Sequence, residues 1–130
     1  MARPKSKTPT PAELAVLKVL WEHGPCTVRE VLQHLPSDRK RAYTSVMTLL
    51  SVMTEKGMLL RKSSGRAFVY SAKGDQDSTL GKIMGEMLGR AFDGSASTLV
   101  AHLLQQSSPN PDELDQIHKA IEHYRREHHS

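Results

Sequence analysis

Apolar residues recur at helical spacing in a segment whose other side is polar. Within residues 39–57, the apolar positions Val46, Leu49, Leu50 and Met53 follow the spacing i, i+3, i+4 and i+7, which places them on one face of a helix. The opposite face carries Arg41, Thr44, Ser45, Thr48, Ser51 and Glu55. The pattern predicts a helix that packs on a core from one side and exposes short hydroxyl side chains on the other.

Two shorter apolar segments come before this helix, and each begins with a capping signal. A Thr followed three residues later by a Glu satisfies N–H groups that would otherwise be unpaired at a helix N-terminus. The two capping pairs are Thr10 with Glu13 and Thr27 with Glu30. Pro11 favours the first helical position, whereas Gly24-Pro25 and Pro36 end the two segments. With residues 37–40 as a loop, the three helices predict a helix-turn-helix.

After Gly57 the spacing becomes that of strands. Residues 58–62 and 66–71 form two strand-like runs around Ser63-Ser64-Gly65, which is a hairpin turn signal. A hairpin directly after a helix-turn-helix is a wing. We therefore expect a mainly α protein with a disordered basic tail over residues 1–9 and a winged helix-turn-helix domain of three helices and a β-hairpin over residues 10–73.

Residues 74–130 are predicted to form a separate helical region. Apolar stripes occur from Ser78 to the break at Asp93-Gly94, over residues 95–106, and after a capping signal at Asn110. Three glycines recur every four residues in the first of these helices, at Gly81, Gly85 and Gly89. Each costs about 1 kcal/mol relative to alanine, so we expect a neighbouring helix to approach closely there.

Three helices of this size do not bury their apolar faces alone, so the pattern favours a symmetric homodimer. The alternative is that the helices pack on the winged domain of their own chain. The residues expected at the dimer interface are Leu80, Ile83, Met84, Gly85, Met87, Leu88, Phe92, Leu99, Leu103, Leu114, Ile117 and Ile121.

Charge divides the chain in the same place. Residues 1–73 carry 13 Lys and Arg against 5 Asp and Glu, a balance of +8, whereas residues 74–130 carry 5 against 9, a balance of −4. A basic half joined to an acidic half indicates a polyanion-binding domain followed by a module with another task.

Hydroxyl groups can hydrogen-bond base edges, and cations can neutralise phosphates. The helix within residues 39–57 and the wing are therefore predicted to bind double-stranded DNA. The predicted DNA-binding residues are Arg39, Lys40, Arg41, Tyr43, Thr44, Ser45, Thr48, Arg61, Lys62 and Arg66. Two alternatives stay open, namely an ordinary amphipathic surface helix and a charged hairpin edge that prevents aggregation.

Other classes of protein are not supported. Cys26 is the only cysteine, which excludes an internal disulfide and a cysteine-based metal cluster, and we expect it to be a small buried hydrophobe. No apolar run is long enough for a membrane span, and the first residues lack the apolar segment of a signal peptide, so a cytoplasmic location is expected. His118 with Glu122 and the pair His128-His129 lack metal-ligand spacing. With no nucleophile or phosphate-loop motif, we predict no enzyme, no cofactor and no metal.

Four short motifs of the chain are Thr27-Val28-Arg29-Glu30, Tyr43-Thr44-Ser45-Val46-Met47-Thr48, Glu55-Lys56-Gly57 and Gly65-Arg66-Ala67-Phe68-Val69-Tyr70. They resemble motifs of the penicillinase-repressor family, which includes the β-lactamase, methicillin-resistance and copper-responsive repressors. The resemblance covers about residues 10–124. It implies a winged-helix domain, a C-terminal helical dimerisation region and binding as a homodimer to inverted-repeat operators in promoters.

The chain departs from the family at three places. Thr44 stands where some members have a base-reading lysine, and the paired C-terminal cysteines of the copper-responsive members are absent. The resemblance also implies derepression by a membrane sensor-protease. The bond that matches the Asn-Phe cleavage site of those repressors is His102-Leu103. The competing functions are a winged-helix protein-interaction module without DNA binding and a repressor that senses a small molecule.

Overall fold

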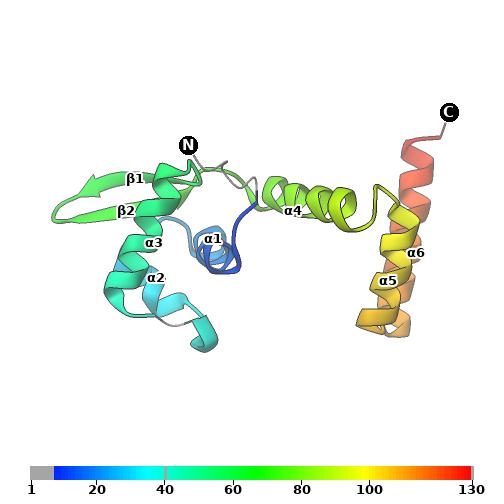
Figure 1. Cartoon of the computed structure of the whole chain (residues 1–130), viewed down its shortest axis with the longest axis horizontal. Helices are drawn as coiled ribbons and strands as arrows, with labels where there is room; N and C mark the ends of the chain where they lie inside the picture. The colour runs from blue at the N-terminus through cyan, green and yellow to red at the C-terminus, as the bar shows by residue number, and fades with distance from the viewer. Residues whose placement is uncertain (1–7, 40, 130) are drawn as a thin grey trace. The chain divides into compact units, whose positions relative to one another are not determined.

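The computed structural model describes residues 8–39 and 41–129, apart from the side chain of Arg39. The chain forms two compact units, one ending at Glu86 and the other beginning at Met87, so that their border lies inside one helix. Figure 1 shows the elements along the chain. They are α1 (Pro11–His23), α2 (Val28–His34), the 3₁₀ turn η1 (Ser37–Arg39), α3 (Tyr43–Glu55), β1 (Leu59–Ser64), β2 (Ala67–Ala72), α4 (Gln76–Ala91), α5 (Ala96–Ser107) and α6 (Pro111–Glu127). The expected mainly α fold with a winged helix-turn-helix is confirmed.

Both predicted capping boxes are present. The hydroxyl of Thr10 accepts a hydrogen bond from the backbone N–H of Glu13 at 3.2 Å, and the Glu13 carboxylate accepts one from the N–H of Thr10 at 2.9 Å. Thr27 and Glu30 repeat the arrangement with the same two distances. The pKa of the Glu30 carboxyl is lowered, mainly by the hydrogen bond from the backbone of Thr27 and further by the one with its side chain. These local bonds fix where α1 and α2 begin.

The N-terminal unit has a core to which α1, α2, α3 and the hairpin all contribute. The buried apolar residues are Val16, Leu17, Val19, Leu20, Cys26, Val28, Val31, Leu35, Val46, Leu50, Met53, Leu59 and Tyr70. Tyr70 on β2 also forms two backbone hydrogen bonds with Cys26, at 2.8 and 2.9 Å, which join the loop between α1 and α2 to the wing. Cys26 is buried as expected. Burial raises the pKa of its thiol, and the Glu30 carboxylate adds to this, so the thiol stays protonated.

A buried ion pair connects the start of α1 to the end of α3. Glu13 is only 2% exposed, and one of its carboxylate oxygens lies 2.8 Å from the ammonium nitrogen of Lys56, the C-cap residue of α3. Burial acts to raise the pKa of Glu13, but the hydrogen bonds from Lys56 and from the backbone of Thr10 outweigh it, so the pKa is lowered. The pair therefore fixes α3 against α1 while Glu13 stays charged.

Three element boundaries differ from the sequence-based prediction. The third helix begins at Tyr43, because its N-cap residue Ala42 is extended and supplies no side-chain cap. Arg41 therefore precedes the helix instead of lying on its polar face. Ser37–Arg39 forms a 3₁₀ turn instead of an open loop. The hairpin turns at Gly65-Arg66, where Gly65 has a φ of +63°, and the serines before it belong to β1.

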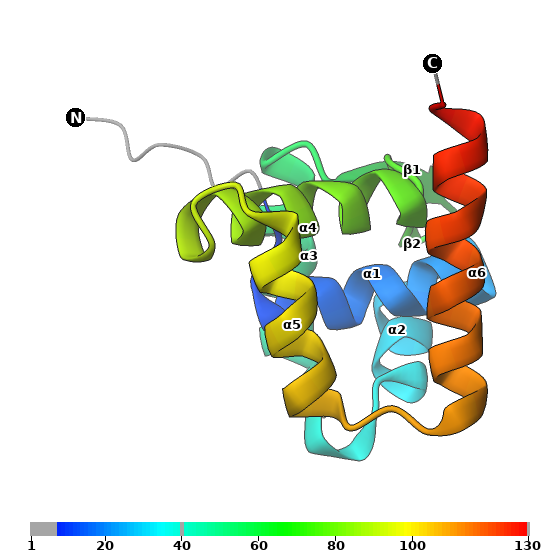
Figure 2. The ribbon, with the colours of Figure 1, turned by 90° about the vertical axis from the view of Figure 1, so that its right-hand side faces the viewer.

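The helices α4, α5 and α6 contain no buried residue among those that the structure describes. Ser95 and the predicted Asn110 cap α5 and α6, and these two helices run in opposite directions in Figure 2. Apart from the adjacent residues and the backbone of α4 itself, a Cβ added at Gly81, Gly85 or Gly89 would meet no atom of the described chain within 4 Å. The close neighbour expected at these glycines is therefore not supplied by the described part of the same chain.

Within residues 8–39 and 41–129, the structure contains no helix that combines the length and the apolar character needed to cross a membrane.

Candidate nucleic-acid interface

Helix α3 is held firmly from behind and exposed in front. Val46, Leu50 and Met53 on its inner side are fully buried, which confirms the predicted packing face. On the other side Thr44, Ser45 and Thr48 are exposed, and Tyr43 at the start of the helix is 44% exposed. Because α2 and the turn η1 precede it along the chain, α3 occupies the position of the second helix of a helix-turn-helix.

The hydroxyl groups on this face are not equivalent. Thr48 donates its hydroxyl hydrogen to the backbone carbonyl of Thr44 at 3.0 Å, within the same helix. Thr54 makes the corresponding bond to Leu50 at 2.8 Å, but its side chain is half-buried. Thr48 therefore presents an oxygen acceptor and a methyl group to the outside, while its only donor is already used.

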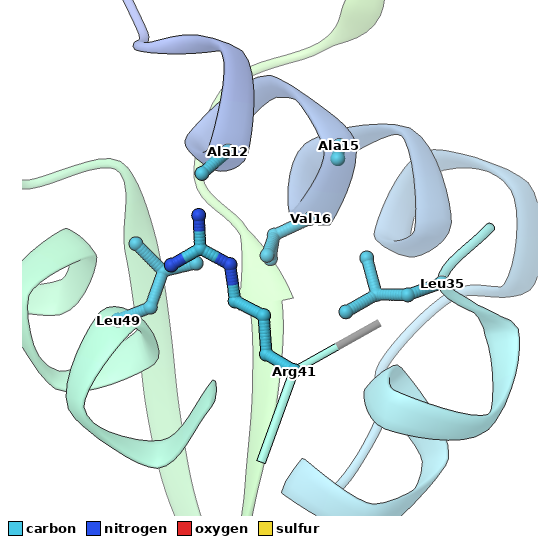
Figure 3. A pocket seen from close by; sticks show the side chains of 6 residues that line it. All are labelled: Ala12, Ala15, Val16, Leu35, Arg41 and Leu49. Atoms are coloured by element: carbon cyan, nitrogen blue, oxygen red, sulfur yellow. The ribbon is translucent and has the colours of Figure 1, made fainter. Parts of the chain in front are cut away.

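The chain enters α3 through Arg41, which is exposed. In Figure 3 its side chain extends past Leu49 of α3 toward Ala12 of α1, over a shallow pocket that is also lined by Ala15, Val16 and Leu35. The aliphatic part of an arginine can cover such an apolar surface while its guanidinium reaches water. The guanidinium therefore lies beside Leu49, in the middle of α3, and near the first turn of α1.

The predicted cations of the wing lie at two different positions along the hairpin. Arg66 lies at the turn, whereas Arg61 and Lys62 lie in β1, opposite Tyr70 and Val69. Since neighbouring residues of a strand point to opposite faces, Arg61 and Lys62 cannot lie on the same face of the hairpin. All three are exposed. Figure 1 shows the hairpin extending away from α1 on the side where α3 lies.

Sequence reasoning missed three residues of this surface. The guanidinium carbon of Arg29, an exposed residue of α2, lies 5.8 Å from the centre of the Tyr43 ring, and that of Arg61 lies 4.3 Å from the ring of Phe68. Phe68 is 45% exposed and Met47 on α3 is 42% exposed. An arginine in the first turn of α2 was a visible signal, but the pairing of Arg61 with Phe68 depends on the strand register.

Two predicted residues cannot be placed in this surface. Lys40 and the side chain of Arg39 fall outside what the structure describes, and only the backbone of Arg39 is seen, in η1. Among the described side chains, no group of three His, Cys, Asp or Glu residues could hold a metal ion. On α6, the exposed side chains of His118 and Glu122 form a pair in which Nε2 of His118 lies 3.1 Å from Oε1 of Glu122.

The architecture defines the class of protein. Three helices, a wing directly after the third, and a polar exposed face on that helix make the N-terminal unit a winged helix-turn-helix domain. The chain belongs to the penicillinase repressor family, because the sequence model of this family matches residues 9–123.

The chain is similar to two repressors along most of its length and to one solved domain over about half of it. The penicillinase repressor of Bacillus licheniformis is 25% identical over 114 residues, which cover 88% of this chain and 89% of the relative. The transcriptional regulator BlaI of Mycobacterium tuberculosis is 32% identical over 111 residues, 84% of this chain and 79% of that protein. The solved DNA-binding domain of the repressor BlaI is 32% identical and covers 52% of this chain and 83% of that domain, with a TM-score of 0.47.

Proposed function

We propose that this protein is a transcriptional repressor that binds double-stranded DNA with α3 in the major groove and the wing on the sugar–phosphate backbone. The observation that carries the proposal is α3 itself, which is fully buried on one side and exposes Thr44, Ser45 and Thr48 on the other. Membership of the penicillinase repressor family supports it. A repressor acts where the DNA is, so the proposal includes a cytoplasmic location. It also includes the absence of enzymatic activity.

The proposal extends to a homodimer that binds inverted-repeat operators. Its support is the apolar surface that the C-terminal helices leave uncovered in one chain. Leu80, Met84 and Met87 of α4 are 42%, 49% and 48% exposed, and Leu103, Leu114 and Ile121 are 45% to 49% exposed. A second copy of the chain would cover these stripes and bring two α3 helices to half-sites about 34 Å apart. Ultracentrifugation at micromolar concentration tests this part, because a monomer would contradict it.

Derepression by proteolysis at His102-Leu103 is a further part of the proposal. Both residues are exposed, but they lie inside α5, and the ring of His102 lies 5.4 Å from the ring of Phe92. A protease needs an extended strand, so α5 must first unwind locally before this bond can be cut. Mass spectrometry of the repressor after induction checks the site, and an intact α5 under inducing conditions would exclude this route.

DNA binding is tested with a duplex that the full-length chain selects from random-sequence DNA. We expect Thr48→Ala to weaken binding to this duplex by about 1 to 3 kcal/mol, with little change on unselected DNA. Thr54→Ala is the matched control, because Thr54 makes the same helix-internal hydrogen bond on a half-buried side of α3. Equal losses on both kinds of DNA would reduce Thr48 to a positioning role.

The two alternatives make different predictions. A protein-interaction module without DNA binding would keep its function when Arg41, Arg61 and Arg66 are replaced. A small-molecule sensor needs a pocket that holds its effector. The pocket under Arg41 has room for about 10 Å³, roughly what a single water molecule requires. That pocket does not accommodate an organic effector.

A further inference from the structure

The exposed side of α3 carries apolar groups among its hydroxyls. Thr44, Met47 and Thr48 are neighbours at the spacing i, i+3 and i+4, and all three side chains are exposed. Met47 is 42% exposed, and it contributes a flexible apolar side chain next to the two threonines. This part of the helix therefore offers methyl groups as well as oxygen atoms to whatever binds it.

The internal hydrogen bond of Thr48 restricts what this residue can recognise. Its hydroxyl hydrogen is engaged by the carbonyl of Thr44 at 3.0 Å, so it has no donor left for N7, O6 or O4 acceptors of bases. What remains is an acceptor for a base amino group and a methyl group for apolar contact. In the major groove, an A·T pair presents both a matching amino group, on adenine, and a matching methyl group, on thymine.

We propose that α3 recognises thymine through its 5-methyl group, with the methyl group of Thr48 and the side chain of Met47 as the contacting groups. The inference rests on the proposed DNA binding and deepens it by naming the feature of the base that is read. It differs from a hydroxyl-based recognition of the same base pair, which would depend on the oxygen of Thr48.

Replacing thymine by uracil tests the inference, because the substitution removes only the 5-methyl group and leaves base pairing unchanged. The probe is the duplex selected by the full-length chain, made again with uracil at one thymine at a time. We expect about fourfold weaker binding at each thymine that is read, which is the factor for about 0.8 kcal/mol per buried methyl-sized group. Measuring the thymine-to-uracil ratio at constant salt cancels the contribution of the phosphates.

Three threonine variants assign the contact. Thr48→Ser removes the methyl group and keeps the hydroxyl, so the thymine-to-uracil ratio should fall to about one at one position of the half-site. Thr48→Val keeps a methyl group without the hydroxyl and should retain the ratio. The matched control is Thr54→Ser, which removes a methyl group from a threonine with the same backbone bond at 2.8 Å, and it should leave the ratio unchanged. Met47→Ala should abolish the ratio at a different thymine.

The outcomes separate the inference from the proposed function. If the selected duplex binds equally well with uracil at every thymine, or if Thr48→Val loses the ratio while Thr48→Ser keeps it, methyl recognition is wrong but DNA binding stands. If the full-length chain selects no duplex over random DNA, the proposed function fails and the inference fails with it.

Discussion

The winged domain and the C-terminal helices contain similar apolar stripes but use them differently. In the winged domain the stripe of α3 is covered by α1, α2 and the hairpin, and Val46, Leu50 and Met53 are fully buried. In α5 and α6 no described residue is buried, and Tyr124 is 63% exposed. A stripe at helical spacing thus predicts which face of a helix is apolar, but not whether another element of the same chain covers that face.

We expect the largest effect when the winged domain is separated from the C-terminal helices by truncation. A chain that ends after Gly74 keeps the carbonyl to which the Trp21 indole donates a hydrogen bond at 3.0 Å, so the winged domain should stay folded. If the C-terminal helices join two copies, the fragment should bind the selected duplex about 10² to 10⁴ times more weakly, because the second domain is no longer tethered. Circular dichroism checks folding and fluorescence anisotropy checks affinity. If the folded fragment binds the duplex as tightly as the full-length chain, the C-terminal helices do not join two DNA-binding domains.

The internal stability of the winged domain is tested at its buried ion pair. We expect Glu13→Gln to lower the free energy of unfolding by about 2 kcal/mol, less than for a fully buried pair, because the Lys56 side chain is 30% exposed and reaches water. Urea denaturation near neutral pH measures the loss. The control Glu22→Gln changes an exposed carboxylate of the same helix and should stay within about 0.5 kcal/mol.

The same pair predicts a dependence on pH. Because the folded-state pKa of Glu13 is lowered from 4.5, its charge stabilises the fold fully above pH 4.5, and this contribution is lost as the pH falls through the folded-state pKa. The stabilities of the wild type and of Glu13→Gln should therefore converge in acid. A constant difference between the two at all pH values would show that packing, and not charge, accounts for the effect.

The glycines of α4 test whether a second copy covers the C-terminal helices. Within the described residues of one chain, no neighbouring atom would obstruct a Cβ at Gly85, so Gly85→Ala alone should stabilise the helix by about 1 kcal/mol. If a partner helix approaches there, the added methyl group should instead raise the dimer dissociation constant about tenfold. Sedimentation equilibrium distinguishes the two results. A more stable helix with unchanged association would place the interface away from these glycines.

The smallest expected effect concerns Phe68, which is exposed although it belongs to the well-covered domain. Phe68→Ala removes the ring beneath the Arg61 guanidinium but keeps the charge, so DNA affinity should fall by about 0.5 to 1 kcal/mol at an unchanged salt dependence. Arg61→Gln should instead reduce the slope of log affinity against log salt by about 0.9. The control Lys18→Gln removes an exposed charge of α1, and its slope should match the wild type.

Local signals in the sequence predicted most of the fold. The capping boxes could be predicted because both partners lie within three residues of one another, and the inner face of α3 because its spacing is regular. The start of α3 could not, since Ala42 gives no capping signal and arginine and alanine both favour helices. For the same reason Arg41 was predicted on the polar face of the helix, although it precedes the helix.

The site was less predictable than the fold because its details depend on geometry between elements. The stacking of Arg61 on Phe68 requires the register of the hairpin, and the approach of Arg29 to Tyr43 requires the angle between α2 and α3. The occupied donor of Thr48 depends on a side-chain rotamer. Hydroxyl-rich positions could thus be recognised as a binding face, whereas the chemical preference of each residue could not.

The two hydrogen bonds between Cys26 and Tyr70 determine how the wing can move. They attach the root of the hairpin to the loop between α1 and α2, while residues from Lys62 to Phe68 are exposed and reach the turn at Gly65. We therefore expect the hairpin to be rigid at its base and to bend more easily toward its tip. In the proposed complex with DNA, the tip could then adjust to grooves of different width, because the bending would stop at Tyr70 and would not change the orientation of α3.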